Sequence, residues 1–463
     1  MAVESGEGLA HRRRAAGRVV RVDWMAVRRQ FRLTSLVVGL VAGIALSALI
    51  IQYVPPRLGD QGGIEPGELV LVSGADSSPD GQRQALIDQW NRLHPKNPVT
   101  VIPVHSQSDA ERSSMIDSAT SGKEVDVYNL DLIWLPEFVE RKFLRPLDSS
   151  TVDTSGFLKA PLDSCRYDGK LWGLPFNSDA GLLFYHKGLL DSTAPPPTTL
   201  SNLAHAAGDA LVKHGQPGQP GYVSQLTAGY AGQLADYEGL TVNALEAIWA
   251  EGGEVVDEDR RVVLDAKRSK GLGWLAEGLA TQAPQIVLPG SRGYHESETT
   301  EAFHDRKVVF MRNWPVAYRQ LQPSSGAPTD GSASDIGVTK LPGPSALGGQ
   351  NLVITSGSRH PRAAQALIEF LTSERSQQIL FERGGFAATR EIIYQDPVIM
   401  AKYPYASILL DAIKHARLRP PVGHYYEFSV EFRQIVVHAL NHNGELPDDA
   451  VEVLTAALSG KLR

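Results

Sequence analysis

The sequence predicts an α/β fold, built from βαβ units around a mostly parallel sheet and preceded by one N-terminal membrane span. Two observations lead to this prediction. Short buried strands alternate with amphipathic helical patterns, in the order 69–72, 82–93, 99–104, 110–121 and 125–129. An uncharged apolar run at residues 33–51 has about the length that a helix needs to cross a bilayer.

The apolar run predicts a retained signal anchor. Only Arg57 follows it closely, whereas its cytoplasmic side is marked by Arg12, Arg13, Arg14, Arg18, Arg21, Arg28, Arg29 and Arg32. By the positive-inside rule the N-terminus is cytoplasmic and the chain after about Tyr53 is exported. We therefore expect a basic tail at 1–32, a transmembrane anchor at 33–54 and a linker rich in proline and glycine at 55–67.

A cleaved signal peptide is the alternative for this segment, because Ala45-Leu46-Ser47 has the small-x-small pattern of a cleavage site. The long basic tail and the continuation of the apolar run to Ile51 favour the anchor. No cysteine follows the run closely, so a lipoprotein-type lipid anchor is not expected.

Composition excludes several classes of protein. A length of 463 residues suggests two or three domains, and a net charge of -7 leaves no overall basic excess for nucleic acid. The single cysteine, Cys165, permits no intramolecular disulfide and no zinc cluster built on cysteines. We expect Cys165 to be a packed, small apolar residue.

Further buried strands are expected at 174–185, 308–311, 336–338 and 351–354. Further helices are expected at 243–251, 362–372 and 428–441, and surface loops at 194–198 and 323–334. In sheets of this kind ligands bind beyond the carboxyl ends of the strands. Residues 73–78 and 129–134 are therefore expected at a cleft.

The usual catalytic motifs are missing from the sequence, which contains no GxSxG, HExxH, Walker loop or CxxC. His304, His360 and His424 lie too far apart to form a recognisable metal motif. We expect no catalytic residue, metal or cofactor. The many aspartates and glutamates keep one enzymatic alternative open, an anchored polysaccharide hydrolase with a pair of carboxylates.

Several segments in order resemble one known family. They are DVYNLDLIWLPEFVERKFLRPLD at 126–148, DGKLWGLPFNSDAGLLFYHKGLL at 168–190, WAEGG at 249–253, FHDRKVVFMRNWP at 303–315 and LPGPSALGGQNLVITSGSRHPRAAQALIEFL at 341–371. Together they resemble the carbohydrate-binding solute receptors of ABC importers, the group that includes maltose- and trehalose-binding proteins. The resemblance covers nearly everything from residue 69 onward.

The resemblance implies a two-lobed, periplasmic-binding-protein-like fold of class II, in which the chain crosses a hinge more than once. One lobe is expected to consist of residues 68–176 and 351–400, and the other of 177–350 and 401–463.

A sugar offers hydroxyl groups and a weakly apolar face, so its site needs aromatic rings and fixed polar groups. At positions that match the family, the sequence supplies Asn129, Asp131, Trp134, Asn177, Asp179, Trp249, Gly252, Trp314, Gly348, Gly349 and Tyr426. Structural roles are the alternatives: core packing for the tryptophans, capping for Asn177, Asp179 and Asp131, and a helix end for Gly252. Tyr425 is the alternative to Tyr426.

The resemblance implies a receptor rather than an enzyme. It would be a single-pass protein of the cell membrane, with its C-terminal domain outside the cytoplasm. The lobes would close around a disaccharide or oligosaccharide, and the closed form would dock on the permease subunits of an ABC-type importer. A ligand-sensing subunit of a membrane complex would use the same cleft with a different partner.

Overall fold

The computed structural model describes residues 63–76, 78–104, 108–193, 195–280, 284–321 and 335–462. Residues 64–463 form one compact unit. The expected tail, anchor and most of the linker lie outside the described residues, as does the loop expected at 323–334. None of the helices in the described ranges is long and apolar enough to span a bilayer.

One sheet has six strands. Its order is β2 (Val99–Val104), β1 (Leu69–Gly74), β3 (Val127–Asp131), β12 (Leu347–Thr355) and β4 (Leu144–Arg145), and β7 (Gly173–Ala180) also pairs with β12. Strand β1 runs parallel to β2 and β3, whereas β12 is antiparallel to β3, β4 and β7.

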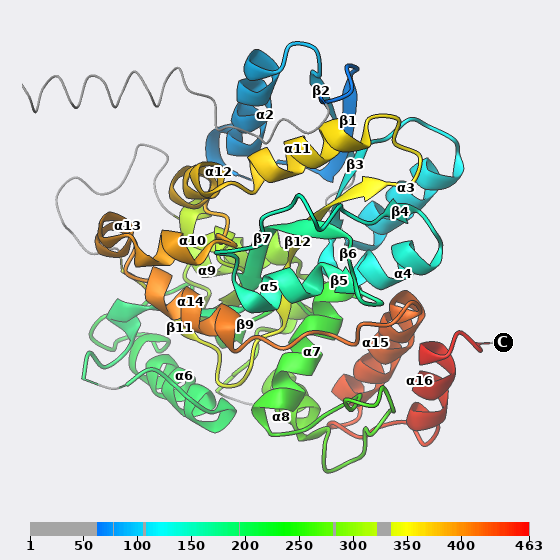
Figure 1. Cartoon of the computed structure of the whole chain (residues 1–463). Helices are drawn as coiled ribbons and strands as arrows, with labels where there is room; N and C mark the ends of the chain where they lie inside the picture. Colours follow the sequence, from blue (N-terminus) through cyan, green and yellow to red (C-terminus); the bar gives the residue numbers. More distant parts are fainter. Residues whose placement is uncertain are drawn as a thin grey trace, which may run out of the picture. The chain divides into compact units, whose positions relative to one another are not determined.

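Both faces of this sheet are buried. Successive residues of a strand point to opposite faces, and apolar side chains occupy both. Leu71 and Leu352 pack with α2 (Gln82–Leu93) and α11 (Pro361–Leu371) on one face. On the other face Tyr128 packs against α3 (Ser108–Thr120) and α4 (Leu135–Glu140). We call this sheet with these four helices the first lobe (Figure 1).

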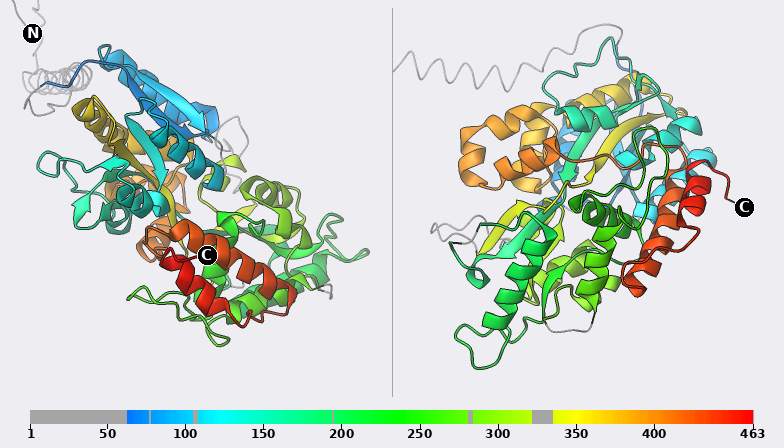
Figure 2. Two further views of the ribbon diagram at one scale, coloured as in Figure 1. Left: turned by 90° about the vertical axis from the view of Figure 1, so that its right-hand side faces the viewer. Right: turned by 90° about the horizontal axis from the view of Figure 1, so that it is seen from below.

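The second sheet has four strands, in the order β11 (Ile336–Lys340), β8 (Leu182–His186), β10 (Val308–Asn313) and β9 (Ala228–Ala231). We call this sheet and the helices packed with it the second lobe. These helices are α6 (Leu200–His214), α7 (Glu238–Ala250), α8 (Lys270–Leu279), α9 (Glu296–His304), α15 (Tyr425–Asn441) and α16 (Ala450–Leu458). Helices α15 and α16 lie side by side in both views of Figure 2.

The other elements are short. The helices are α5 (Lys159–Ser164), α10 (Val316–Gln320), α12 (Glu374–Ile379), α13 (Pro397–Lys402) and α14 (Ala406–Lys414). A two-stranded sheet pairs β5 (Arg166–Tyr167) with β6 (Lys170–Leu171). Single turns of 3-10 or π-helix are η1 (Pro79–Gly81), η2 (Leu132–Trp134), η3 (Lys187–Leu189), η4 (Pro289–Gly293), η5 (Leu380–Gly384) and η6 (Glu391–Gln395).

Three segments connect the lobes and hydrogen-bond to one another. Gly181 joins β7 to β8, residues 341–346 join β11 to β12, and residues 415–424 join α14 to α15. The Gly181 amide donates to Ser345 Oγ (2.5 Å). The Arg417 amide donates to the Ser345 carbonyl (2.8 Å), and the Leu347 amide to the Arg417 carbonyl (2.8 Å). We call these three connected segments the hinge.

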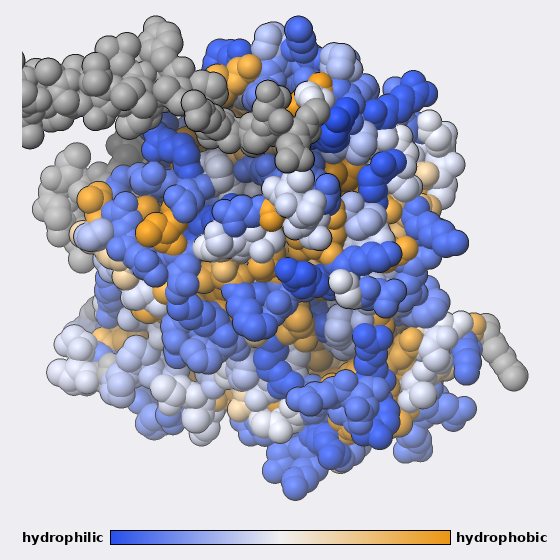
Figure 3. All heavy atoms as spheres, in the orientation of Figure 1, coloured by the Kyte–Doolittle hydropathy of each residue, from blue (hydrophilic) through white to orange (hydrophobic). Residues whose placement is uncertain are grey.

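Most elements expected from the sequence are present. The strands expected at 69–72, 99–104, 125–129, 308–311, 336–338 and 351–354 correspond to β1, β2, β3, β10, β11 and β12. The run at 174–185 forms two strands, β7 and β8, and the expected helices correspond to α2, α3, α7, α11 and α15. Cys165 is fully buried, as expected. Hydrophilic side chains cover most of the face seen in Figure 3.

The expectation of a mostly parallel sheet is wrong. In the first lobe β12 returns from the second lobe and enters the sheet from the opposite end, so its three pairings are antiparallel. In the second lobe only β9 and β10 are parallel, while β8 is antiparallel to β10 and β11. Strands joined by βαβ units run parallel, whereas a strand that enters the sheet after the chain has crossed from the other lobe runs antiparallel to its neighbours.

Candidate functional site

Strand pairing brings six of the predicted site residues to one place beside the hinge. In the register of β12, Gly348 lies opposite Asp179 of β7, Gly349 opposite Ser178, and Gln350 opposite Asn177. On its other edge β12 pairs with β3, where Gln350 lies opposite Asp131 and Leu352 opposite Asn129. Asn129, Asp131, Asn177, Asp179, Gly348 and Gly349 are thus neighbours across three adjacent strands.

Asp179 is the most strongly perturbed of these groups. Its Oδ2 accepts a hydrogen bond from Asn177 Nδ2 (2.9 Å), and the Gln350 amide donates to Asn177 Oδ1 (3.3 Å). Burial raises the pKa of Asp179 to about 7 and the negative charge of Asp131 adds to the rise, although Asn177 and Arg312 oppose it. Asp179 can therefore exchange a proton near neutral pH.

Asp131 lies at the carboxyl end of β3, where it caps the turn η2 by accepting from the Ile133 amide (3.2 Å). Its Oδ1 is 3.6 Å from Arg419 Nη2. Burial raises the pKa of Asp131, while the charge of Arg419 opposes that rise. Capping, the structural alternative for Asp131, is confirmed, whereas its part in ligand binding stays a prediction. Both of these contacts use Oδ1 of the carboxylate.

Glu111 of α3 was missed from the sequence. Its Oε1 accepts a hydrogen bond from the Gly74 amide (2.9 Å), at the end of β1. Burial raises the pKa of Glu111 to about 7, and the charge of Asp131 contributes in the same direction. One signal was available in the sequence. Glu111 lies in the first turn of the helix that follows β2, and the carboxyl ends of parallel strands share one edge of the sheet.

Arg419 was also missed, and no pattern in its irregular segment would have indicated it. Its side chain is only 2% exposed and lies 2.8 Å from Glu238 Oε1. Its Nη2 donates to the carbonyl of Leu347 in β12 (3.2 Å). Burial alone lowers the pKa of this guanidinium, but the charges of Asp131 and Glu238 raise it overall. Arg419 joins the hinge to both lobes.

Asn129 carries an unsatisfied acceptor. Its Nδ2 donates to Ser73 Oγ (3.0 Å), which also accepts from Arg83 Nη1 (2.7 Å). The buried Oδ1 of Asn129 has no hydrogen-bond partner among the described residues. Because buried polar atoms are normally paired, this oxygen is a candidate acceptor for a ligand hydroxyl.

Trp314 extends this cluster into the second lobe. Its indole N–H donates to Glu296 Oε1 (3.3 Å), and the Arg312 guanidinium lies 3.8 Å from a ring centroid. A Cβ atom placed on Gly348 would lie 3.0 Å from the indole ring, so a side chain there would crowd Trp314. Trp314 therefore reaches the strand pair that carries Asp179.

Trp134 and Tyr426 meet on another side of Asp131. Their ring centroids are 6.1 Å apart in an edge-to-face arrangement, and Arg112 lies 3.9 Å from the Tyr426 ring. Trp134 is buried, whereas Tyr426 is half-buried. Tyr425 is buried and donates to Glu238 Oε1 (2.6 Å), so Tyr426 is the more accessible of the two tyrosines.

Trp249 and Gly252 lie at the end of α7, and none of the contacts described for them reaches a residue of this cluster. The buried Trp249 donates to Glu254 Oε1 (3.1 Å), and Arg417 of the hinge lies 4.6 Å from its ring. Gly252 has a φ of 71° and follows the last residues of α7, as a glycine that ends a helix does. The part of these two residues in ligand binding stays a prediction.

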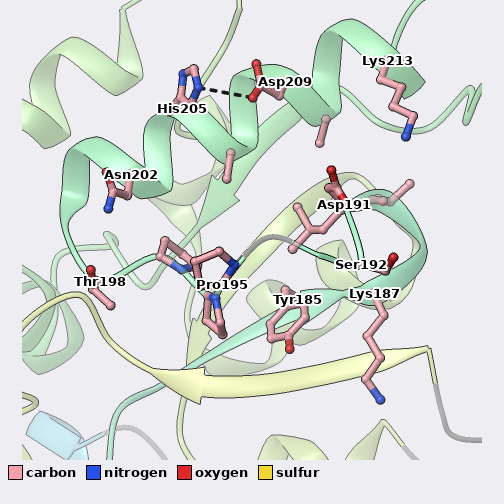
Figure 4. Close-up of a pocket in the computed structure, with 16 residues that line it drawn as sticks. Tyr185, Lys187, Asp191, Ser192, Pro195, Thr198, Asn202, His205, Asp209 and Lys213 are labelled. Atoms are coloured by element: carbon pink, nitrogen blue, oxygen red, sulfur yellow. Dashed lines mark ion pairs between the residues drawn. The ribbon is translucent and has the colours of Figure 1, made fainter.

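A separate cavity of about 710 Å³ lies in the second lobe, between β8, α6 and the proline-rich loop (Figure 4). Tyr185 and Pro195 line it, and His205 pairs with Asp209 (3.4 Å) on α6 above it. None of the predicted site residues lines this cavity. We place the site at the strand cluster instead, because buried carboxyl groups and an unpaired amide oxygen gather there.

The arrangement suits the binding of a neutral polar solute. Carboxylates accept from hydroxyl groups, Arg419 and backbone amides donate, and Trp314 and Tyr426 provide apolar ring surface. Among the described residues no group of histidine, cysteine and acidic side chains could hold a metal ion.

Similarity to known proteins extends over most of the chain. Residues 85–405 match the family model described as bacterial extracellular solute-binding protein. A probable ABC transporter-binding protein of Deinococcus radiodurans is 29% identical over 78% of this chain and 86% of its own. The mannitol-binding protein of Pseudomonas aeruginosa is 24% identical over 66% and 71% of the two chains. The maltose-bound structure of MalE3 from T. maritima has a TM-score of 0.75 and 28% identity, covering 85% of this chain and 100% of that one.

Proposed function

The chain belongs to the bacterial extracellular solute-binding proteins, and on that basis we propose that it is a carbohydrate receptor of an ABC-type importer. The observation that carries the proposal is the cluster of Asn129, Asp131, Asn177, Asp179 and Trp314 where the hinge joins the two lobes. Relatives described as maltose-bound, mannitol-binding and ABC transporter-binding support the class of ligand and of partner.

The proposed mechanism is closure of the two lobes on the ligand. Asp131 belongs to the first lobe and Trp314 to the second, so a sugar that contacts both gains its full binding free energy only in the closed form. A ligand shifts a conformational equilibrium by its difference in affinity for the two states. Rotation about the three hinge segments would supply the motion, and permease subunits would recognise the closed form.

The lobe boundaries predicted from the sequence, at residues 176/177, 350/351 and 400/401, differ from the hinge segments, which lie at Gly181, 341–346 and 415–424. The first boundary falls within β7 and the second within β12, both of which continue toward the hinge.

We further propose that residues 33–54 tether the receptor to the membrane with residues 1–32 in the cytoplasm. The uncharged run at 33–51 and the arginines before it support this topology. The tether would keep the receptor beside permease subunits in the same membrane. Protease added to intact cells should then remove the C-terminal part and leave a short protected N-terminal fragment; recovery of a freely secreted, shortened protein would favour signal cleavage.

A hydrolase is the second candidate, because Glu111 and Asp179 each have a pKa of about 7 and could act as proton donors. The family membership favours binding over catalysis. One experiment separates the two functions: calorimetric titration of the purified full chain, in a detergent without a sugar headgroup, with glucose, mannitol, maltose and trehalose.

We expect saturable binding, with the carbohydrate recovered unchanged when it is chromatographed afterwards. Recovery of shorter products would replace the receptor by the hydrolase. Absence of binding across the panel would contradict the assignment to carbohydrates.

A further inference from the structure

An ion pair joins the two lobes beside the candidate site. Arg433 Nη1 of α15 lies 2.7 Å from Asp109 Oδ2 of α3. The Arg433 side chain is 6% exposed and that of Asp109 is 27% exposed, so the pair is largely shielded from water. Helix α3 packs on the six-stranded sheet, whereas α15 packs on α7 and α8 of the second lobe.

A second contact between the same helices lies close by. Arg112 follows Asp109 by one turn of α3, and its guanidinium lies 3.9 Å from the ring of Tyr426. Glu137 holds that guanidinium through two hydrogen bonds of 2.7 and 2.6 Å. Residues three or seven apart lie on one face of a helix. One face of α3 therefore meets one face of α15 at two points.

This contact borders the candidate site. Trp134 follows Asp131 in the same turn and packs edge-on against Tyr425 and Tyr426, with centroids 5.7 and 6.1 Å apart. The charge of Asp109 also acts on Asp131 and raises its pKa further. Anything that extends from Asp131 between α3 and α15 must separate these residues.

We propose that the Asp109–Arg433 pair bounds the candidate site on the side of α3 and α15 and restricts the ligand to one or two sugar units or a short polyol. A longer chain extending from the site between these two helices would have to break the pair. That step removes the shortest ion pair of the nearly buried Arg433, whose Nε lies 3.5 Å from Asp236 Oδ1. Separating a shielded ion pair is costly because a largely buried charge loses its nearest partner.

This inference rests on the proposed carbohydrate function and adds the length of the ligand to it. The test is calorimetric titration of the full chain with glucose, maltose, maltotriose and maltotetraose. We expect maltotetraose to bind wild type at least about tenfold more weakly than maltose, a difference of about 1.4 kcal/mol. In Asp109→Ala we expect that gap to shrink to less than about threefold.

Two further variants keep the test specific. The conservative exchange Arg433→Lys keeps a cation beside Asp109 and Asp236 and should keep the gap. The matched control removes an exposed ion pair confined to the first lobe, Glu124→Ala with Arg359→Ala, and should leave the gap as in wild type.

Equal affinity of wild type for maltose and maltotetraose would overturn the length limit and leave the carbohydrate receptor standing. An unchanged gap in Asp109→Ala would assign the limit to other residues and overturn the role of the pair. Binding of none of the four sugars by wild type would overturn the carbohydrate function itself, and the length limit with it.

Discussion

Three carboxyl groups in the candidate site resist ionisation because they are buried near one another. Asp131 contributes to the raised pKa values of both Glu111 and Asp179. The positive charge of Arg419 favours ionisation of Asp131, and that of Arg312 favours ionisation of Asp179. Neither arginine forms a close ion pair with Asp179. A carbohydrate that donates hydroxyl hydrogen bonds would stabilise the ionised carboxylates without adding charge.

The raised pKa of Asp179 predicts a pH-dependent stability. In the unfolded chain the group titrates near 3.8 and in the folded protein near 7, so the folded state holds the proton more tightly. Stability therefore falls as pH rises from about 4 to about 7. Asp179→Asn keeps the acceptor for Asn177 but cannot ionise.

The unfolding free energy of Asp179→Asn minus that of wild type should be larger at pH 8 than at pH 5, by about 1–3 kcal/mol. Urea denaturation at the two pH values measures this difference. Asp117→Asn, at an exposed position of α3, serves as the matched control. A difference between Asp179→Asn and wild type that is the same at both pH values would contradict a buried, neutral Asp179.

Trp314 should contribute to affinity through its ring surface. We expect Trp314→Ala to weaken sugar binding by about 1–3 kcal/mol, which is the scale of a lost aromatic contact with its buried area. Titration of the folded variant tests this. Trp274→Ala removes a half-buried tryptophan of α8 outside the predicted site and is the control. Equal affinities of Trp314→Ala and wild type would remove Trp314 from the site.

The site residues that lie in or beside strands could be predicted from the sequence, whereas Arg419 and Glu111 could not. Asn129, Asp131, Asn177 and Asp179 follow from motifs in or beside strands, and the register of β12 brings them together. Arg419 could not be identified, since its partners Asp131 and Glu238 lie far away in the sequence and its own segment has no periodicity. Predicting Glu111 would have required knowing that α3 borders the ends of the strands.

At the scale of single elements, β12 combines strand pairing with the hinge. It carries an irregularity in register between Gln350 and Asn351. Just before it, Gly349 has a φ of 116°, a conformation that residues with a side chain rarely adopt. A Cβ atom at Gly349 would also lie 2.2 Å from the carbonyl oxygen of Asn177. This glycine therefore permits close approach of β7 and β12 at the site.

Gly349→Ala should lower the unfolding free energy by about 1–3 kcal/mol from backbone strain, with the collision adding to the loss. Gly252→Ala is a matched comparison, because Gly252 also has positive φ (71°) but a Cβ there would meet no atom within 4 Å. We expect it to cost only about 1 kcal/mol. Denaturant titration of both variants measures the difference, and equal losses would refute the special role of Gly349.

Element positions were largely predictable, whereas strand directions were not. Apolar runs identify β1, β3, β10 and β12 because buried strands read as continuous hydrophobic segments. The edge strand β2 is also largely apolar in sequence, although most of its residues are partly or fully exposed. The antiparallel pairing of β12 depends on the path of the chain between lobes, which no local pattern records. The long run at 174–185 hid the break at Gly181, where the chain leaves one sheet for the other.

For the whole molecule, the hinge and the contacts around it determine how the lobes move. Ser345 connects the first and second crossing segments through Gly181, and its carbonyl accepts from Arg417 of the third. The buried Glu246 accepts from the amide of Ala346 (3.0 Å) and pairs with Arg312 (2.8 Å), which lies against Trp314. Contacts at the site thus continue into the segments that would bend.

The central claim is that a carbohydrate binds between the lobes, at the strand cluster beside the hinge. Amide hydrogen exchange of the full chain, with and without a saturating sugar from the titration panel, tests it most directly. We predict slower exchange in both lobes, at residues 127–134, 173–181, 312–316 and 345–351. Protection confined to residues 185–213, around the cavity in Figure 4, would contradict the account and move the site into the second lobe alone.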